Sequence, residues 1–302
     1  MKEDVLIITL DSCRYDTFKH LFDKNLIPNL KSVGQLYRAQ SPSHFTYGSH
    51  ASFWMGFTPG IANTKKPYLN PKAGKLFRMS HSGLPTNNRD CFTLIGKNIV
   101  DGFNNQNYTT IGTGAVEWFN PSTETGAVLG SDFKAFYFAE NTWSLNNQLE
   151  WINKQLELCS PEQKVFCFLN VGETHVPYWH EGASWERWPS PCVPFGGDSC
   201  DAMESAFRQR SCLEWVDFEL GPLLRRFEDS TILVCADHGD CWGEDGLWEH
   251  GISHAATLTV PLLLRVRGEP VNATQPPLAN KPSPSRFRSG FSRLKRWLKA
   301  RL

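Results

Sequence analysis

The chain has 302 residues, of which 40% are hydrophobic and 21% are charged, and its formal net charge is zero. This composition excludes a disordered polymer, and the length allows one large hydrophobic core or two small ones. No run of about 18 apolar residues occurs, so the sequence predicts no transmembrane helix.

Short apolar runs alternate along the chain with longer segments of helical spacing. The first run is rich in Ile and Val, which is typical of a strand buried on both faces. Strands are predicted at residues 5–10, 109–111, 165–171, 231–236 and 258–266, and helices within residues 142–158 and 202–227. The Trp- and Pro-rich residues 178–200 are predicted to be irregular and to lie over one edge of the sheet. The alternation predicts a three-layer α/β/α domain with a largely parallel central sheet.

The basic residues are concentrated at the C-terminus. Residues 281–302 contain eight Lys or Arg and no acidic residue, which leaves 23 basic and 31 acidic residues elsewhere. We predict a body at residues 1–268, a Pro-rich linker at 269–285 and a basic amphipathic tail at 286–302. Apolar residues at helical spacing in the tail suit peripheral contact with an anionic membrane surface. A partly disordered tail and a helix docked on the acidic body are also compatible with this pattern.

The N-terminus and the cysteines indicate a location. The apolar run in MKEDVLIITLDS is too short for a secretory signal and ends in an acid. The nine cysteines are irregularly spaced and include no CxxC pair, so most are expected to be free thiols, many of them buried. We therefore expect a cytoplasmic protein.

Polar residues follow three of the predicted strands directly. The first strand runs into Asp11, a central one leads to His175, and a later one runs into Asp237 and His238. Ligands of open α/β sheets bind outside the carboxyl ends of the strands, so these residues are predicted to meet in one site. Carboxylate and imidazole groups suit a divalent metal ion. The competing interpretation makes the two aspartates helix caps.

The segment FTYGSHASFWMG places a threonine before a stretch of small residues that is able to open a helix. Backbone N–H groups at a helix N-terminus bind anions such as phosphate or sulfate. The hydroxyl of Thr46 is placed to bind a metal ion and to attack such an anion. The competing interpretation makes Thr46 and Ser49 helix caps.

Four segments, in the same order, resemble the alkaline phosphatase superfamily across residues 4–266. VLIITLDSCRYD resembles its opening strand, whose first aspartate binds metal, and FLNVGETHVPY resembles the segment that ends in His-x-Pro-Tyr. CADHGDCWGEDGLWEHG and TVPLLLR resemble the metal-binding DHG segment and the strand after it. FTYGSHASFWMGFTPG lines up with the sulfatase signature C/S-x-P-S-R-x-x-x-x-x-G. Thr46 falls on its nucleophile, Ser49 on its Ser, His50 on its Arg and Gly56 on its Gly.

This resemblance, nearest to small sulfatase-like bacterial proteins, implies an alkaline phosphatase-like fold with one metal ion. The implied ligands are Asp11, Thr46, Asp237 and His238. Manganese, zinc, calcium and magnesium all suit this oxygen-rich set. The metal would lower the pKa of the threonine hydroxyl, and a phospho-threonine would then be released to water or another acceptor.

Histidines are implied to contact the substrate. His175 and His250 are assigned to the non-bridging oxygens or to protonation of the leaving group, and His254 and His50 are further substrate-binding candidates. A second metal ion could be held by Glu173, His175 and His250 together. That second ion is not favoured, because the Asp-x-x-x-His pair of two-metal relatives is absent.

Departures from the family pattern bear on the reaction. Sulfatases oxidise a Cys or Ser nucleophile to formylglycine, and Thr46 cannot give that aldehyde. The Pro and Arg of the signature are replaced by Gly48 and His50. Formylglycine-type sulfate hydrolysis is therefore disfavoured and phosphoryl chemistry is preferred.

The sequence thus predicts a metal-dependent hydrolase of phosphoric mono- or diesters that acts on a small molecule or modified peptide. An acidic body disfavours nucleic acid as a substrate. With an alcohol acceptor the same site would be a phosphotransferase. The sequence also allows a different metal-assisted enzyme of a biosynthetic pathway, and a non-catalytic anion-binding or scaffold protein.

Overall fold

The computed structural model describes residues 3–56 and 97–272. They belong to one compact unit, Met1–Asn272. The predicted tail and most of the predicted linker lie outside the described residues. Within the described ranges, no helix has both the length and the hydropathy that a bilayer crossing requires.

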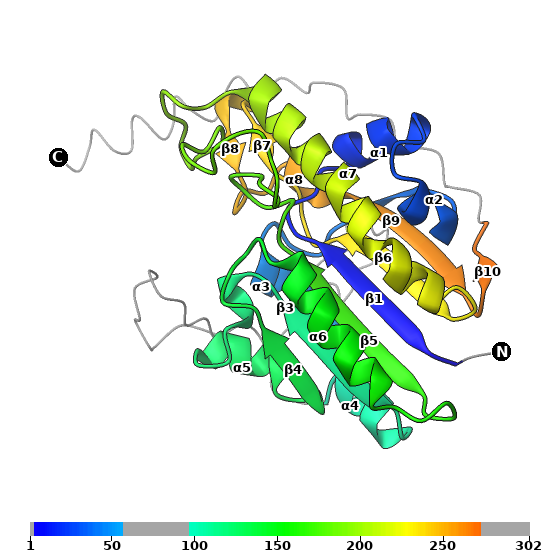
Figure 1. Cartoon of the computed structure of the whole chain (residues 1–302). Helices are drawn as coiled ribbons and strands as arrows, with labels where there is room; N and C mark the ends of the chain where they lie inside the picture. The colour runs from blue at the N-terminus through cyan, green and yellow to red at the C-terminus, as the bar shows by residue number, and fades with distance from the viewer. Residues whose placement is uncertain (1–2, 57–96, 273–302) are drawn as a thin grey trace, which may run out of the picture. The chain divides into compact units, whose positions relative to one another are not determined.

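The unit is built on a sheet with the strand order β10-β9-β6-β1-β5-β3-β4, and β2 pairs with β9 (Figure 1). The strands are β1 (Val5–Leu10), β2 (Tyr37–Gln40), β3 (Thr109–Gly114), β4 (Ala135–Phe138), β5 (Val165–Val171), β6 (Thr231–Ala236), β9 (Thr259–Val266) and β10 (Glu269–Pro270). The five strands from β6 to β4 are parallel, whereas β9 is antiparallel to β6, β2 and β10. The predicted, largely parallel sheet is confirmed.

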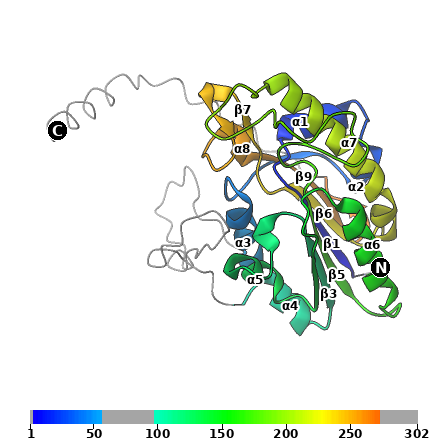
Figure 2. The same cartoon turned by 60° about the vertical axis from the view of Figure 1, so that its left-hand side comes forward.

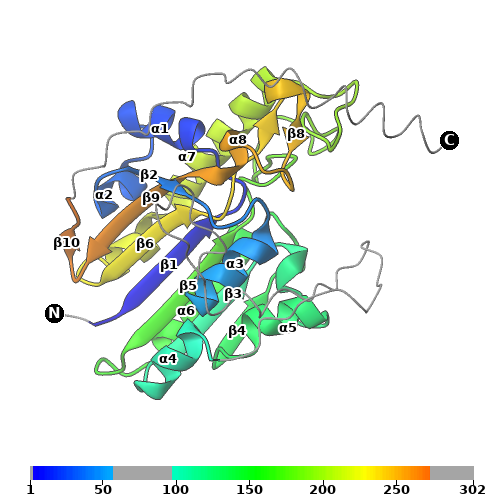
Figure 3. The same cartoon turned by 180° about the vertical axis from the view of Figure 1, so that it is seen from behind.

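Helices cover both faces of this sheet. One face carries α1 (Tyr15–Asp23), α2 (Pro28–Val33), α6 (Leu145–Glu157) and α7 (Ala202–Arg226), and the other carries α3 (Thr46–Met55), α4 (Ile99–Asn105) and α5 (Glu124–Gly130). Figure 2 shows the two groups on opposite sides of the strands, and Figure 3 shows α3, α4 and α5 in front. The predicted three-layer architecture is confirmed.

Short elements make up the rest of the described unit. They are the 3-10 helices η1 (Glu117–Phe119) and η2 (Glu244–Gly246), the hairpin of β7 (Cys241–Trp242) and β8 (Trp248–Glu249), and the helix α8 (Ala255–Leu258). Residues 178–200 contain no helix or strand, as predicted, and Tyr178 and Cys192 pack with Trp242 in a small cluster. The eight described cysteines are all free, and most of them are buried.

The central strands are continuously apolar because both of their faces are covered. All seven residues of β5 are buried. Successive side chains of a strand point to opposite faces, so Cys167 and Leu169 pack in the core under α6 and α7. Phe166 and Phe168 point the other way, into an aromatic core with Trp54 of α3.

The register of the central strands decides where the site forms. Leu10, the last residue of β1, pairs with Val171 at the end of β5 and with Ala236 at the end of β6. The residues that follow all three strands therefore emerge side by side at one edge of the sheet. Asp11 therefore lies between the residues that follow β5 and those that follow β6. Its backbone N–H donates to the carbonyl of Val171 at 2.9 Å.

Candidate active site

Four side chains that the sequence placed together do meet at this edge. Thr46 Oγ1 lies 3.4 Å from Asp11 Oδ2 and 3.3 Å from His238 Nε2. The same imidazole nitrogen lies 3.8 Å from Asp11 Oδ1 and 3.6 Å from Asp237 Oδ2. All four side chains are buried. We call these four residues the ligand cluster.

The threonine is presented by the first turn of α3. Phe45 is the N-cap of α3 and makes no side-chain cap hydrogen bond, and Thr46 is the first helical residue. The hydroxyl of Thr46 is directed at Asp11 and His238. Ser49 Oγ donates to the backbone carbonyl of Asp237 at 2.7 Å. The capping interpretation of both residues is therefore wrong. Gly48, in the first turn of α3, allows Ser43 to approach the helix closely, because a Cβ there would lie 2.4 Å from Ser43 Oγ.

The two carboxylates are held by backbone and side-chain donors from the strand ends. Asp237 Oδ1 accepts from the N–H groups of Ser12 at 3.2 Å and His238 at 2.9 Å. Asp11 Oδ2 accepts from Asn170 Nδ2 at 3.3 Å. These donors do not belong to the first turn of a helix, so the competing helix-cap interpretation of the two aspartates is also wrong.

One oxygen of the ligand cluster has no hydrogen-bond partner among the described residues. Asp237 Oδ2 is buried without a hydrogen bond, although buried polar atoms almost always have one. Burial, followed by the nearby charge of Asp11, raises the pKa of Asp237 well above its ordinary value. A buried carboxylate oxygen beside a second carboxylate, an imidazole and a hydroxyl matches the donor set of a divalent cation. The ligand cluster therefore fits a metal ion.

His238 has the form that a metal ligand needs. Burial lowers its pKa well below the ordinary value, so the imidazole is neutral near pH ~7. Its Nδ1 lies 3.1 Å from the carbonyl of Gly239, which leaves Nε2 as the nitrogen that faces the other ligands. A Cβ on Gly239 would lie 2.4 Å from the carbonyl of Ala256, so this loop passes α8 only with glycine there.

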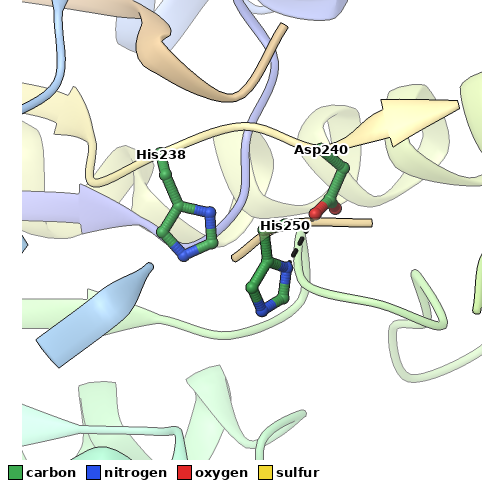
Figure 4. A group of neighbouring side chains, drawn as sticks. All are labelled: His238, Asp240 and His250. Atoms are coloured by element: carbon green, nitrogen blue, oxygen red, sulfur yellow. Dashed lines mark hydrogen bonds and ion pairs between the residues drawn. The ribbon is translucent and has the colours of Figure 1, made fainter. Parts of the chain in front are cut away.

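Two further predicted histidines lie beside the ligand cluster. The ring of His250 is centred 5.1 Å from that of His175 and 4.5 Å from that of His238. Figure 4 shows the rings of His238 and His250 side by side. Burial alone would lower the pKa of His250, but its hydrogen bond with Asp240 and the charge of that residue raise it to about 9. This edge of the sheet thus combines a neutral imidazole with a cationic one.

The structure argues against substrate contact for His50. Its ring is fully buried, with Nε2 2.9 Å from Thr9 Oγ1 and Nδ1 2.8 Å from the carbonyl of Thr46. Burial lowers its pKa to about 4, and the ring packs edge-on against Phe119. Both nitrogens of His50 are therefore engaged on the buried side of α3, where Nδ1 contacts the carbonyl of Thr46 in the first turn.

His254 is likewise not brought into the ligand cluster. It is the N-cap of α8, where its Nδ1 accepts from the N–H of Ala256 at 3.0 Å. Its Nε2 lies 3.4 Å from Asp245 Oδ2. The residue lines a separate cavity of about 300 Å³, together with Arg14 and Arg38. The predicted substrate contact is not supported, because both nitrogens serve local structure.

Sequence reasoning missed several residues of this region. Asp240 forms a hydrogen bond with His250, and Asn170 forms one with Asp11. His44 has a buried Nδ1 without a hydrogen-bond partner among the described residues. The backbone carbonyl of His44 accepts from the N–H of Gly251, which brings it close to His250. The strand-end argument could have found Asp240, two residues beyond His238. Asn170 and His44 carry no such signal.

Glu173 contacts the start of α6. It is 1% exposed, and its Oε1 accepts from the N–H of Leu145 at the start of α6 at 2.8 Å. The other carboxylate oxygen has no hydrogen-bond partner among the described residues. Burial raises the pKa of Glu173 to about 7. This carboxyl accepts from the start of α6, which gives no support to the second metal site that the sequence already disfavoured.

Replacing Glu173 by Gln is expected to change the stability in a pH-dependent way. The pKa of Glu173 rises from an ordinary 4.5 to about 7 on folding, so the folded state holds a proton that the unfolded state releases in this window. The wild type therefore loses up to about 3 kcal/mol of unfolding free energy as the pH rises from 4.5 to about 7. Denaturant unfolding of both proteins at about pH 5 and about pH 8 measures the unfolding free energy of the variant relative to the wild type. This difference should favour the Gln variant more strongly at the higher pH. The same difference at both pH values would contradict the assignment.

Comparisons of sequence and of structure give different results. No protein-family model matches the chain, and no curated protein matches it. Solved structures do match, at low sequence identity. The integral membrane lipooligosaccharide phosphoethanolamine transferase EptA of Neisseria meningitidis is 14% identical with a TM-score of 0.56. The match covers 89% of this chain and 48% of EptA, so this chain spans about half of that enzyme.

Two further structures extend the likeness. The C-terminal periplasmic domain of EcEptC from Escherichia coli, in complex with Zn, is 13% identical with a TM-score of 0.58, over 88% of this chain and 73% of that one. A Vibrio parahaemolyticus protein described as belonging to the alkaline phosphatase superfamily is 14% identical with a TM-score of 0.53, over 89% and 61% of the two chains. Identities this low establish the fold alone. The chain therefore has the fold of the alkaline phosphatase superfamily.

Proposed function

We propose that the chain is a metal-dependent hydrolase of phosphoric esters, with Thr46 as its nucleophile. The observation that carries this proposal is the position of the Thr46 hydroxyl, which lies within 3.4 Å of both Asp11 and His238 in a buried cluster where one carboxylate oxygen has no hydrogen bond. One divalent ion is proposed there. When bound, it would lower the pKa of the hydroxyl and neutralise charge on the phosphoryl oxygens.

The chain's own residues supply the remaining parts of the reaction. Thr46 is the first residue of α3, and a helix N-terminus favours an anion at that position. Thr46 Oγ1 gives its proton to water and forms a bond to phosphorus while the ester P–O bond breaks, and the leaving oxygen takes a proton from His250 or His175. Water then attacks the phospho-threonine, one of its protons restores the Thr46 hydroxyl and the other returns to the histidine, and phosphate (or, from a diester, a phosphomonoester) is released.

Threonine at the nucleophile position supports phosphoryl over sulfuryl chemistry, because it cannot become formylglycine. The small-molecule or modified-peptide substrate remains a proposal, as does the exclusion of nucleic acid. The predicted cytoplasmic location also stays a prediction, and the similar EcEptC domain is described as periplasmic. Zinc is the first metal to test, because that domain was solved in complex with Zn.

The direct test is turnover by the chain after metal removal and reloading with zinc, manganese, magnesium or calcium. Aryl phosphate monoesters and diesters, aryl phosphonates and aryl sulfates are compared at matched concentrations. We expect phosphorus esters to be cleaved and sulfates to be left intact. Faster cleavage of sulfates would overturn the proposal. Metal binding without turnover of any ester would favour an anion-binding or scaffold protein, or a different metal-assisted reaction.

A phosphotransferase is the second candidate. The observation that favours it is the match to EptA and to the EptC periplasmic domain of Campylobacter jejuni, both of which are described as phosphoethanolamine transferases. Hydrolysis and transfer share the attack by Thr46 and differ only in what accepts the group. Product analysis with and without an added alcohol separates them, because transfer yields the phosphorylated alcohol in place of free phosphate.

A further inference from the structure

Buried hydrogen bonds form a line that connects His250 through Asp240 and Tyr178 to Trp242. Asp240 Oδ1 lies 2.8 Å from His250 Nδ1, and Asp240 Oδ2 accepts from the hydroxyl of Tyr178 at 2.7 Å. The indole N–H of Trp242 donates to that hydroxyl at 2.8 Å. Asp240 and Tyr178 are fully buried and Trp242 is 8% exposed. Figure 4 shows Asp240 bonded to His250, with the ring of His238 alongside.

The directions of these bonds follow from the chemistry of the groups. An indole nitrogen only donates, so the oxygen of Tyr178 must accept from Trp242 and use its own proton on Asp240. The carboxylate of Asp240 can only accept, so His250 Nδ1 carries a proton toward it. Nε2 is then the ring nitrogen of His250 that remains for another group.

Arg14 contacts Trp242, at the end of this line of hydrogen bonds that is farthest from His250. Its guanidinium lies 4.2 Å from the ring centroid of Trp242, and its Nη1 donates to the backbone carbonyl of Asp240 at 2.9 Å. A second bond joins it to Glu244 at 2.6 Å. The indole and the backbone of Asp240 are therefore both held by the same buried cation, which limits how far the line can shift.

We propose that Asp240, oriented by Tyr178 and Trp242, is a positioning residue that holds the Nδ1 proton and fixes the direction of His250. In this arrangement Nε2 of His250 is presented to the group bound at Thr46. The inference rests on the proposed function, because it assigns His250 to the same reaction. It differs from a second metal site at His238, Asp240 and His250, whose ligand atoms lie within 4.8 Å of one another. Both oxygens of Asp240 and Nδ1 of His250 are already hydrogen-bonded, which favours the positioning role.

The test compares Asp240→Asn, Tyr178→Phe, His250→Ala and the double variant Asp240→Asn/His250→Ala in the metal-loaded chain. Asp240→Asn is expected to lower kcat/KM for aryl phosphates by about 10- to 100-fold, as loss of an orienting partner commonly does. Tyr178→Phe keeps the buried ring and should give a smaller loss of the same kind. Because Asp240 acts through His250, its substitution should add almost nothing in the His250→Ala background. Metal content per chain should not change.

The matched control is Asp245→Asn on the same connection. The Asp245 side chain is 84% exposed and faces His254, so its loss of charge should leave kcat/KM unchanged. Two outcomes would overturn the positioning role. One is an equal loss from Asp240→Asn with and without His250, and the other is a fall in metal content, which would make Asp240 a ligand.

A measurement without substrate separates this inference from the proposed function. Proton NMR of the histidine-labelled chain should show a His250 Nδ1 proton in slow exchange with water. The signal should disappear in His250→Ala and move in Asp240→Asn and Tyr178→Phe, but not in Asp245→Asn. An unchanged signal in Asp240→Asn would refute the positioning role even if no ester is turned over. A moved signal without turnover would support it while the proposed function fails.

Discussion

Adding zinc or manganese to the metal-free chain is expected to raise its thermal unfolding midpoint by about 10 °C. A ligand that binds only the folded state at a thousandfold excess over its Kd adds about 4 kcal/mol, and each kcal/mol shifts Tm by about 2–4 °C in a domain of this size. The physical reason is the burial of two carboxyl groups, Asp11 and Asp237, close to one another. Calorimetry after chelation, with and without added metal, measures the shift.

The variant Asp237→Asn should remove most of this shift. The amide oxygen still accepts from the N–H groups of Ser12 and His238, but the negative charge at the ligand cluster is lost. The metal-free variant should be at least as stable as the metal-free wild type, because an amide at this buried position has no ionised form that burial would disfavour.

A matched control for this variant is Asp217→Asn. Asp217 is also buried, and it accepts from the N–H of Leu30 in α2 at 2.7 Å instead of belonging to the ligand cluster. Its substitution should leave the metal-induced shift intact. A full shift in Asp237→Asn would contradict the assignment of Asp237 as a ligand.

Removing the hydroxyl in Thr46→Ala is expected to lower kcat/KM for phosphoric esters by at least about 10³-fold, as loss of a nucleophile does. Thr46→Ser keeps an oxygen at the start of α3 and should retain turnover within about 100-fold of the wild type. Mass spectrometry of a quenched reaction should find one phosphoryl group on the Thr46 peptide of the wild type, and none in the alanine variant.

The control for the nucleophile is Ser52→Ala, in the same helix. Ser52 is buried and its hydroxyl donates to the backbone carbonyl of Gly48 at 2.8 Å, so the substitution removes a hydroxyl from α3 without touching the ligand cluster. Its turnover should stay close to that of the wild type. Wild-type rates in Thr46→Ala would show that the phosphoryl group is never carried by this residue.

The central strands were predictable because burial on both faces leaves an unbroken apolar signal. The predicted bounds of β1, β5 and β6 agree with the structure residue by residue. Their register then brings Asp11 and Asp237 together without any further information. Short elements were missed for the opposite reason. β4 has four residues, all only partly buried, so it carries neither a long apolar run nor a clean alternation.

The direction of individual histidines could not be read from the sequence. Nine of the ten residues of α3 are buried, so the helix has no polar face that would tell which way His50 points. His254 is a local cap, a role that many polar residues fill. The link from Tyr178 to Asp240 joins segments that are 62 positions apart, and only the folded chain reveals it.

The neighbouring positions of β1 and β6 have a consequence for the order of folding. Asp11 is near the start of the chain and Asp237 follows a strand more than two hundred positions later, yet their strands are adjacent. Contacts between such distant segments form late and slowly, since a long loop must close first. The proposed metal therefore cannot nucleate folding in the way that it does in a zinc finger. It enters after synthesis of β6 is complete, so shortages of metal should yield a folded, inactive chain instead of an unfolded one.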